Sequence, residues 1–455
     1  MHYLIVGNSA AAVGAIEAIR TVDREGEITV VAGEKEHVYS RPLIAHLVAG
    51  EVTEERMPYR PADFYRLHNV RTCLGEMVEK VDYAGQKVIL AGGEEIGYDR
   101  LLLATGSKAA LPPLFRKSLK GLLTFQTYAD AQEILSLLKQ GKKKAVVVGA
   151  GLIGLRAAYG LQMAGAAVTL VEFLPRVLSR VLDEEGSAFV EDILKEGGLN
   201  VFTGRSVKEI TEENGEVKGV VLDDGTQLEC GILVAATGVV PNLDLAQGLK
   251  TGQGIVVNEF FQTSYSNVFA AGDVAETRDI ARDGQYRVNA NWPNAYTQGR
   301  LAGLNMAGRP TPYKGSLGMN TVSFYGVPVV SLGVFDPEGE KEAGYEVKTR
   351  KIPAHRIYQK LVFKENRLKG AIFIGDLGYC GAVKDMITEQ HLTGIIKDAI
   401  LEEKYQLYGF LRKRRAEKLE GKSIRWPESY SSPQKYVKSF NEETWTERER
   451  DERPW

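Results

Sequence analysis

The feature that most constrains the fold is a pattern that the chain carries twice: an apolar run, a turn of small residues, a helix and a second apolar run. In the first copy, the apolar run 2–6 is followed by the turn 7–12, a helix that continues to Arg20, and the apolar run 28–31. Two short apolar runs joined by one helix are typical of a βαβ unit, in which the two strands are parallel.

The second copy lies further along the chain. The apolar run 145–148 leads into the glycine-rich turn 149–154, an alanine-rich helix that continues to Ala164, and the apolar run 168–171. A pattern that occurs twice indicates two domains of the same kind. We therefore expect an α/β protein with two Rossmann-like, three-layer domains.

The turns indicate what these domains bind. A glycine-rich turn between a strand and a helix places backbone N–H groups and the positive end of the helix against a pyrophosphate. The turn 149–154 matches G-x-G-x-x-G fully, and Glu172 ends the next apolar run. A carboxylate at that point accepts hydrogen bonds from a ribose and repels a 2′-phosphate, which favours NADH over NADPH.

The first turn is looser, because Ser9 and Ala12 occupy the second and third glycine positions, and Glu34 is its ribose candidate. Either turn alone is also compatible with an ordinary tight turn. Two copies, each in a βαβ unit and each followed by an acid, predict two dinucleotide sites in one chain.

Composition excludes several other classes of protein. The 57 lysines and arginines against 59 acids leave a net charge of −2, so no basic field attracts nucleic acid. The three cysteines, Cys73, Cys230 and Cys380, are far apart, which excludes a disulfide framework and a Cys-rich metal site. We expect no metal. The chain lacks a signal-peptide pattern and a long apolar run, so we expect no membrane span and a cytoplasmic protein.

A third pattern lies after the second copy. Residues 263–273 read TSYSNVFAAGD, and two apolar runs end in Ala-Thr-Gly, at 104–106 and at 236–238. The run 263–273 resembles the second FAD motif of the pyridine nucleotide–disulfide oxidoreductase superfamily, and the resemblance extends from residue 1 to about residue 400. It implies FAD and NAD(H) as cofactors, with Asp273 at the ribityl chain of FAD.

The resemblance also implies an order of domains. A FAD-binding domain at 1–112 is interrupted by an NAD-binding domain at 113–246 and resumes at 247–313. An α+β C-terminal interface domain follows at 314–404, through which a homodimer is expected, and a charged tail at 405–455 ends the chain.

The C-terminal part carries its own local signals. Three prolines predict a linker within 284–318, the apolar runs 359–363 and 368–374 predict strands, and a helical pattern covers 382–404. The tail combines charge blocks with aromatic residues of the kind common at interfaces, so we expect it to contact a partner chain. The alternative is a charged coil. These aromatic residues are Trp426, Tyr430, Tyr436, Phe440, Trp445 and Trp455.

The stretch 39–46 (YSRPLIAH) separates the branches of this superfamily. The thiol-dependent branches carry a redox-active cysteine here, and the serine of this stretch cannot replace a thiolate chemically. The Y-x-R-P-x-L pattern is instead similar to the rubredoxin, ferredoxin and nitrite reductase branch. That resemblance implies a flavin that exchanges electrons with iron–sulfur or iron centres.

Two positions depart from the ferredoxin reductases of that branch, which carry a lysine beside flavin N5 paired with a glutamate. His46 takes the lysine position and Arg156 the glutamate position, and with Arg41 they are the candidate catalytic residues beside the flavin. A cation there still stabilises an anionic hydroquinone. The alternatives are a packed helix residue for His46 and a surface or phosphate-contacting cation for Arg156. Trp292 opens a run similar to the branch's flavin-side W-x-N-A-x-x-Q-G, and either covers the flavin or fills a core.

The candidate cofactor-binding residues form two sets. The FAD set is Gly7, Ser9, Ala12, Glu34, Arg41, Pro42, Thr105, Gly106, Gly272, Asp273 and Trp292. The NAD set is Gly149, Gly151, Leu152, Ile153, Gly154, Glu172 and Gly238.

The sequence therefore predicts an FAD-dependent NADH:acceptor oxidoreductase that exchanges electrons with an iron–sulfur protein, as the NADH-reacting subunit of a larger redox complex. Flavin chemistry needs few protein acids or bases, in agreement with the lack of a Ser/His/Asp pattern. One alternative is a stand-alone NADH oxidase or small-molecule reductase. Another is a flavin-bearing structural or redox-sensing subunit.

Overall fold

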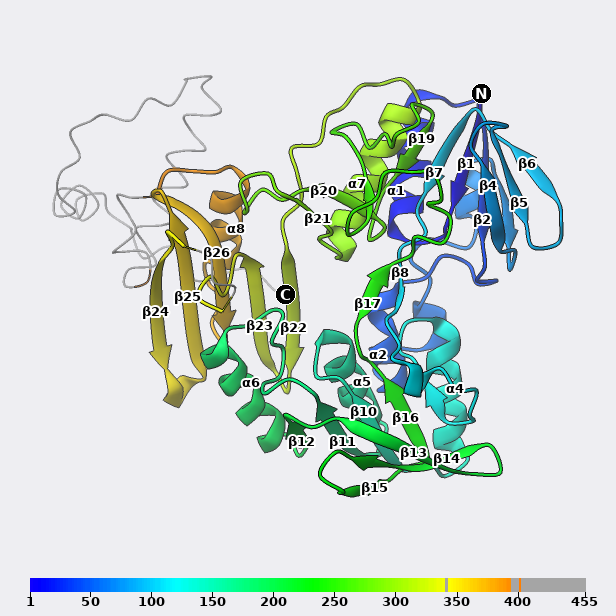
Figure 1. Ribbon diagram of the computed structural model, residues 1–455. Helices are drawn as coiled ribbons and strands as arrows, with labels where there is room; N and C mark the ends of the chain where they lie inside the picture. Colours follow the sequence, from blue (N-terminus) through cyan, green and yellow to red (C-terminus); the bar gives the residue numbers. More distant parts are fainter. Residues whose placement is uncertain (340–342, 394–400, 402–455) are drawn as a thin grey trace, which may run out of the picture.

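The computed structural model describes residues 1–339, 343–393 and 401 (Figure 1). Its first sheet has five parallel strands in the order β19-β7-β1-β2-β3. Helices α1 (Ala10–Val22) and α7 (Trp292–Met306) lie on one side of it, and the three-stranded sheet β4-β5-β6 lies on the other (Figure 1). The strands are β1 (His2–Val6), β2 (Glu27–Ala32), β3 (Val70–Leu74), β4 (Val78–Asp82), β5 (Lys87–Leu90), β6 (Glu95–Gly97), β7 (Arg100–Leu103) and β19 (Val268–Ala270).

The second sheet repeats this architecture, with five parallel strands in the order β12-β11-β10-β16-β9 and a three-stranded sheet β13-β14-β15. Its strands are β9 (Leu122–Leu123), β10 (Lys144–Val148), β11 (Ala167–Glu172), β12 (Asn200–Thr203), β13 (Val207–Glu213), β14 (Glu216–Leu222), β15 (Gln227–Glu229) and β16 (Ile232–Ala235). Its helices are α4 (Tyr128–Lys139), α5 (Leu152–Met163) and α6 (Glu184–Glu196).

The third sheet is antiparallel, in the order β22-β23-β26-β25-β24. Its elements are β22 (Met319–Phe324), β23 (Val327–Gly333), β24 (Glu346–Ile352), β25 (Ile357–Lys364), β26 (Arg367–Ile374) and helix α8 (Cys380–Thr388). The helix predicted for 382–404 was too long: α8 ends at Thr388, because Gln390 turns the chain with a φ of +52°. Part of 394–404 and the predicted tail 405–455 lie outside the described residues.

Short elements connect the three parts. Strands β8 (Ser107–Ala109) and β17 (Val239–Pro241) pair antiparallel between the first two sheets. The other strands are β18 (Ile255–Val256), β20 (Ala275–Arg278) and β21 (Tyr286–Arg287), and the other α-helices are α2 (Ile44–Val48) and α3 (Phe64–Leu67). Single 3-10 turns are η1 (Arg41–Leu43), η2 (Glu54–Arg56), η3 (Pro113–Phe115) and η4 (Pro353–His355).

Helix α7 corrects the linker predicted within 284–318. Its first turn contains Pro293, a position where a proline ring is tolerated because the N–H that it lacks would have no helical acceptor. The helix packs closely on α1: a Cβ on Gly299 would lie 1.9 Å from the carbonyl oxygen of Ala11. The segment predicted to be a linker therefore completes the core of the first α/β unit.

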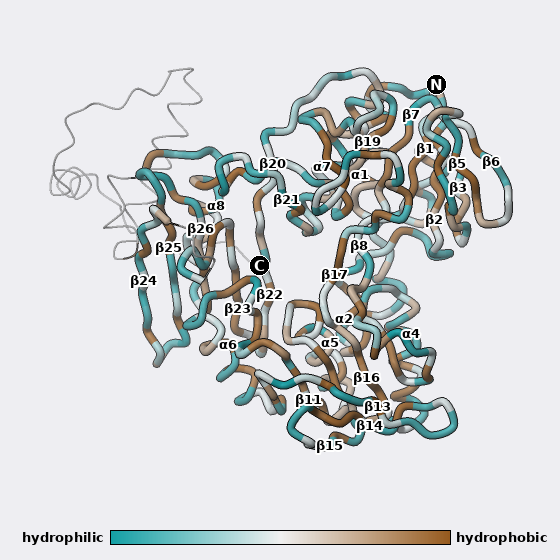
Figure 2. The backbone as a smooth tube through the Cα atoms, viewed as in Figure 1, coloured by the Kyte–Doolittle hydropathy of each residue, from teal (hydrophilic) through white to brown (hydrophobic). Residues whose placement is uncertain are grey.

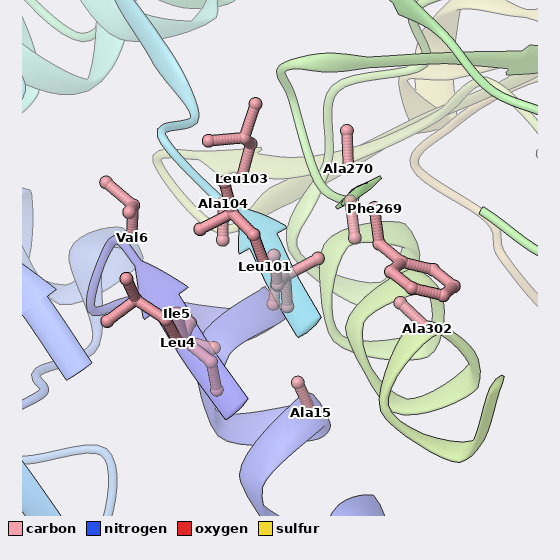
Figure 3. Close-up of a cluster of buried hydrophobic side chains, with 14 of the residues drawn as sticks. Leu4, Ile5, Val6, Ala15, Leu101, Leu103, Ala104, Phe269, Ala270 and Ala302 are labelled. Carbon is pink, nitrogen blue, oxygen red and sulfur yellow. The ribbon is translucent and has the colours of Figure 1, made fainter. Parts of the chain in front are cut away.

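The interior of that unit is apolar, as the sequence pattern requires. Figure 3 shows side chains of β1, β7 and β19 packed with Ala15 of α1 and Ala302 of α7, and all of the labelled residues are buried. The hydrophobic segments concentrate in the strands and inward helix faces, and the loops are mostly hydrophilic (Figure 2). The fold class predicted from the sequence is confirmed, while the four domain boundaries stay predictions. Among the described residues, no helix is long and apolar enough to cross a bilayer.

Candidate functional site

A single cleft of about 1320 Å³ lies at the carboxyl ends of the two parallel sheets. In α/β proteins ligands bind at this edge, where the loops after neighbouring strands diverge. Both small-residue turns contribute to its wall, 7–11 from the first unit and 149 with 151–153 from the second. The two sites predicted separately from the sequence therefore share one cavity.

The first turn follows β1 and is shaped by Gly7. Its φ is +118°, and a Cβ would lie 2.1 Å from the carbonyl oxygen of Ala104, so only glycine fits. Ser9 is the N-cap of α1 and lines the cleft. Ala12 does not line it, because it is fully buried where α1 packs against the sheet.

The second turn follows β10, and its glycines have different roles. Gly149 has a φ of +104°, and a Cβ there would lie 2.3 Å from the carbonyl oxygen of Ala236. Gly151 is the N-cap of α5 and faces open space in the cleft. Gly154 does not line the cleft: a Cβ would lie 1.8 Å from the Gly149 carbonyl oxygen, so this glycine allows the helix to approach the turn.

Glu172 ends β11 at the rim of the cleft, and its carboxylate is fixed by two backbone donors. The N–H of Ala150 donates to one oxygen at 2.5 Å, and the N–H of Leu174 donates to the other at 2.8 Å. Each oxygen retains further acceptor capacity. The carboxylate is therefore oriented beside the turn, where a nucleotide ribose would lie.

Glu34, after β2, has a comparable position in the first unit but is held by side chains. The Tyr39 hydroxyl donates to Glu34 at 2.6 Å, and the Arg41 guanidinium forms an ion pair with the same carboxylate. Arg41 also donates to the carbonyl oxygen of Gln126 at 2.9 Å. Burial, with Glu34 nearby, raises the pKa of Tyr39, so its hydroxyl stays a donor. The cluster places one guanidinium in the cleft wall.

Asp273 lies in the loop after β19 and is a half-buried acid of the cleft wall. Burial raises the pKa of its carboxyl, opposed by a hydrogen bond from the Ser107 hydroxyl at 3.2 Å. Gly272 donates its N–H to the side-chain oxygen of Gln298 at 2.8 Å, which fixes the loop against α7. Trp292, at the start of α7, lines the cleft and meets the Tyr59 ring edge-on.

The other predicted residues divide between the cleft and the layer behind it. Arg156 and His46 contact each other at 2.5 Å, between Nη2 and Nε2, but neither side chain lines the cleft. The wall near them is formed by Ile44 of α2 and Ile153 of α5. The remaining predicted residues that line the cleft are Arg41, Pro42, Thr105, Gly106, Gly272, Leu152, Ile153 and Gly238.

Several residues of the wall were missed from the sequence. Ser107 directly follows the first Ala-Thr-Gly run, which was the available signal. Phe173 follows Glu172, lines the cleft and has 72% of its surface exposed. Arg180 lines it further along and has no hydrogen bond or ion pair with another described residue. No pattern in the sequence distinguished these two from ordinary surface residues.

The side chains that line the cleft determine which chemistry it can support. Its lining residues include five carboxylates and two guanidiniums, and no cysteine. Cys230 is buried elsewhere, and burial raises the pKa of its thiol to about 12. Within the described ranges, no group of three or more His, Cys, Asp or Glu side chains is placed to hold a metal ion.

Comparison with known proteins agrees with this geometry. Residues 1–299 match the family model described as pyridine nucleotide-disulphide oxidoreductase, and residues 319–391 match the rubredoxin NAD+ reductase C-terminal domain. The solved covalent putidaredoxin reductase–putidaredoxin complex superposes with a TM-score of 0.78 at 27% identity, covering 86% of this chain and 94% of that chain.

Two curated relatives extend the comparison. The epsilon subunit of NADH-dependent phenylglyoxylate dehydrogenase from Aromatoleum evansii is 35% identical over 366 residues, 79% of this chain and 85% of that subunit. Nitrite reductase [NAD(P)H] of Bacillus subtilis (strain 168) is 32% identical over 391 residues, 85% of this chain, which spans about half (47%) of that longer protein. The chain thus belongs to the pyridine nucleotide-disulphide oxidoreductase family, as its sequence motifs predicted.

Proposed function

We propose that this protein transfers hydride between NAD(H) and FAD and exchanges the electrons with an iron–sulfur protein, as the NADH-reacting subunit of a larger redox complex. The observation that carries the proposal is the single cleft that both dinucleotide turns enter, with no thiol in its wall. The family membership supports a flavin- and pyridine nucleotide-dependent oxidoreductase.

The residues of the first unit fit FAD. The turn at Gly7 and the start of α1 offer backbone N–H groups to a pyrophosphate, and Glu34 offers a carboxylate to a ribose. Asp273 is half-buried and hydrogen-bonded to Ser107, and such an acid gains from the hydroxyl groups of a ribityl chain. Trp292 offers an aromatic face to the same space.

The residues of the second unit fit NADH. The turn 149–154 and the start of α5 suit the pyrophosphate, and Glu172 suits the ribose hydroxyls. A 2′-phosphate would place its charge beside that fixed carboxylate and be repelled. We therefore expect NADH to be preferred over NADPH.

The bound flavin would supply a hydride acceptor that also releases electrons singly. The protein's own contribution is to bind both dinucleotides in one cleft, which makes their reaction effectively unimolecular. Apolar wall residues such as Ile44, Leu152 and Ile153 exclude water from the space between the two sites.

Three observations support an external iron–sulfur partner. The cleft wall holds no thiol among its lining residues, so the flavin is the only electron carrier that this wall offers. The C-terminal sheet matches the domain of rubredoxin NAD+ reductases, and rubredoxin is an iron–sulfur protein. The name of the Aromatoleum relative describes a subunit of a larger NADH-dependent enzyme. A homodimer through the C-terminal sheet and contact of the tail 405–455 with a partner chain are further parts of the proposal.

The test is anaerobic stopped-flow mixing of the FAD-loaded protein with NADH, followed by mixing with oxidised ferredoxin or rubredoxin. We expect rapid bleaching of the flavin and then reoxidation by the iron–sulfur protein. In an NADH oxidase, the reduced flavin would instead be reoxidised rapidly by oxygen alone and slowly by the iron–sulfur protein. Bound FAD that NADH does not bleach would refute the proposal in favour of a structural or sensing role.

A further inference from the structure

Four polar side chains join the two dinucleotide-binding units directly behind the cleft. Helix α2 follows the cleft residues Arg41 and Pro42, and helix α5 follows the second turn. The two helices pack closely, since a Cβ on Gly160 would lie 2.9 Å from the carbonyl oxygen of Ala45. Because both helices also place side chains in the cleft wall, their spacing sets the spacing of the two sites.

The cluster consists of His46 and Glu51 from the α2 segment and Arg156 and Tyr159 from α5. Glu51 contacts His46 Nδ1 with one carboxylate oxygen, and its other oxygen accepts a hydrogen bond from the Tyr159 hydroxyl at 2.5 Å. Arg156 Nη2 lies 2.5 Å from His46 Nε2, and its guanidinium carbon lies 5.7 Å from the centre of the Tyr159 ring. Each helix is thus tied to the other at two points.

The donors and acceptors determine the protonation of His46 in this arrangement. A guanidinium only donates, so Nε2 of the imidazole must be the acceptor and carry no proton. The proton is then on Nδ1, from which it is donated to the Glu51 carboxylate. His46 is therefore a neutral imidazole held between a cation and an anion.

The charged groups that face His46 are Arg156 and Glu51. Arg156 forms no ion pair with a carboxylate among the described residues, and burial lowers its pKa. The hydrogen bond from Tyr159 lowers the pKa of Glu51, and His46 adds to that effect against the opposing effect of burial. Glu51 thus stays a carboxylate.

The ionisable groups on the other neighbouring elements are engaged elsewhere. Arg41 of η1 pairs with Glu34, and Asp130 of α4 caps the start of its own helix. The hydroxyl of Tyr128 in α4 is hydrogen-bonded to Glu54 and Gln132. Tyr325, whose ring meets that of Tyr159, hydrogen-bonds to Gln162.

We infer that Glu51 and Tyr159 are positioning residues that hold the His46–Arg156 contact, and through it the FAD-side helix α2 and the NAD-side helix α5, in the arrangement that hydride transfer requires. The inference rests on the proposed function.

The experiment measures the limiting rate of flavin reduction, and the NADH concentration that gives half of that rate, by anaerobic stopped flow of the FAD-loaded protein. Glu51→Gln removes the carboxylate that contacts His46 and Tyr159, so we expect a limiting rate about tenfold lower, as slight misplacement produces, with the half-saturating NADH concentration unchanged. In a His46→Gln background, the same change of Glu51 is expected to have a smaller effect.

Tyr159→Phe removes a single hydroxyl, so it tests the hydrogen bond from Tyr159 to Glu51 with little risk to folding. We expect a lower limiting rate with unchanged FAD content. Glu55→Gln is the matched control, because Glu55 is an exposed acid on the neighbouring turn η2. If Glu51→Gln and Tyr159→Phe retain the wild-type limiting rate, the inference is wrong. If wild-type flavin is not bleached by NADH, the proposed function fails instead.

Discussion

The contact between α6 and the C-terminal sheet provides a sharp test of the packing. Asp183 is the N-cap of α6 and accepts from the N–H of Gly186 at 2.9 Å. The same carboxylate accepts from the Tyr358 hydroxyl at 2.6 Å and from the Lys360 ammonium at 2.8 Å, both on β25. The Lys360 and Asp183 side chains are only 6% and 9% exposed. One carboxylate therefore anchors the second α/β unit to the third sheet.

Replacing Asp183 with Ala leaves Lys360 buried without a counter-charge. Breaking a buried pair in this way destabilises a protein by about 3–5 kcal/mol, and the lost cap adds about 1 kcal/mol. For units of this size we expect the midpoint of thermal unfolding to fall by roughly 10 °C. The double variant Asp183→Ala with Lys360→Met also removes the unpaired ammonium of Lys360, so we expect it to recover most of the lost stability.

The assay is thermal unfolding of the FAD-loaded protein by circular dichroism, with the four proteins of the double-mutant cycle compared at one concentration. Glu185→Gln is the control, because Glu185 of α6 pairs with Lys351 on β24 of the same sheet but both side chains are about half exposed. Its expected effect is below about 1 kcal/mol. An Asp183→Ala variant no less stable than Glu185→Gln, or a double variant worse than either single one, would refute the reasoning.

Two further predictions concern the dinucleotide sites, and one concerns a buried thiol outside the cleft. Gly154→Ala places a Cβ against the Gly149 carbonyl, so we expect FAD to be retained while flavin reduction by NADH is largely lost, as measured by absorbance and stopped flow. Glu172→Ala removes the ribose acceptor and the repulsion of a 2′-phosphate; the ratio of kcat/KM for NADH to that for NADPH should fall by about tenfold or more, and an unchanged ratio would contradict the role of Glu172. Cys230 is buried and its pKa is raised to about 12, so thiol reagents at pH 8 should label it only after unfolding, which mass spectrometry of the labelled peptides checks.

The two α/β units were predictable because their signals are local. The turns at Gly7 and Gly149 need glycine for a positive φ and a close backbone approach, and a few neighbouring residues in the sequence are enough to indicate such a turn. The strands that they follow are continuous apolar runs, as buried parallel strands require. The acids Glu34 and Glu172 follow at the ends of the next strands for the same topological reason.

The misses depend on tertiary contacts. Helix α7 was predicted to be a linker, because its prolines and small residues are typical of segments that interrupt helices. The packing of α1 against it, which explains the small residues, is not visible in the sequence. Phe173 and Arg180 look like surface residues, and only the fold turns them toward the cleft. Glu51 meets Tyr159, and His46 meets Arg156, only across the junction of the two units, between residues far apart in the sequence.

The central claim is that electrons pass through flavin alone, without a thiol. An anaerobic titration of the FAD-loaded protein with NADH, followed by the flavin absorbance, tests it most directly. The account predicts that bleaching is complete at one NADH per FAD, since the cleft wall holds no second two-electron acceptor. A requirement for two NADH per FAD, or flavin that stays oxidised, would contradict it.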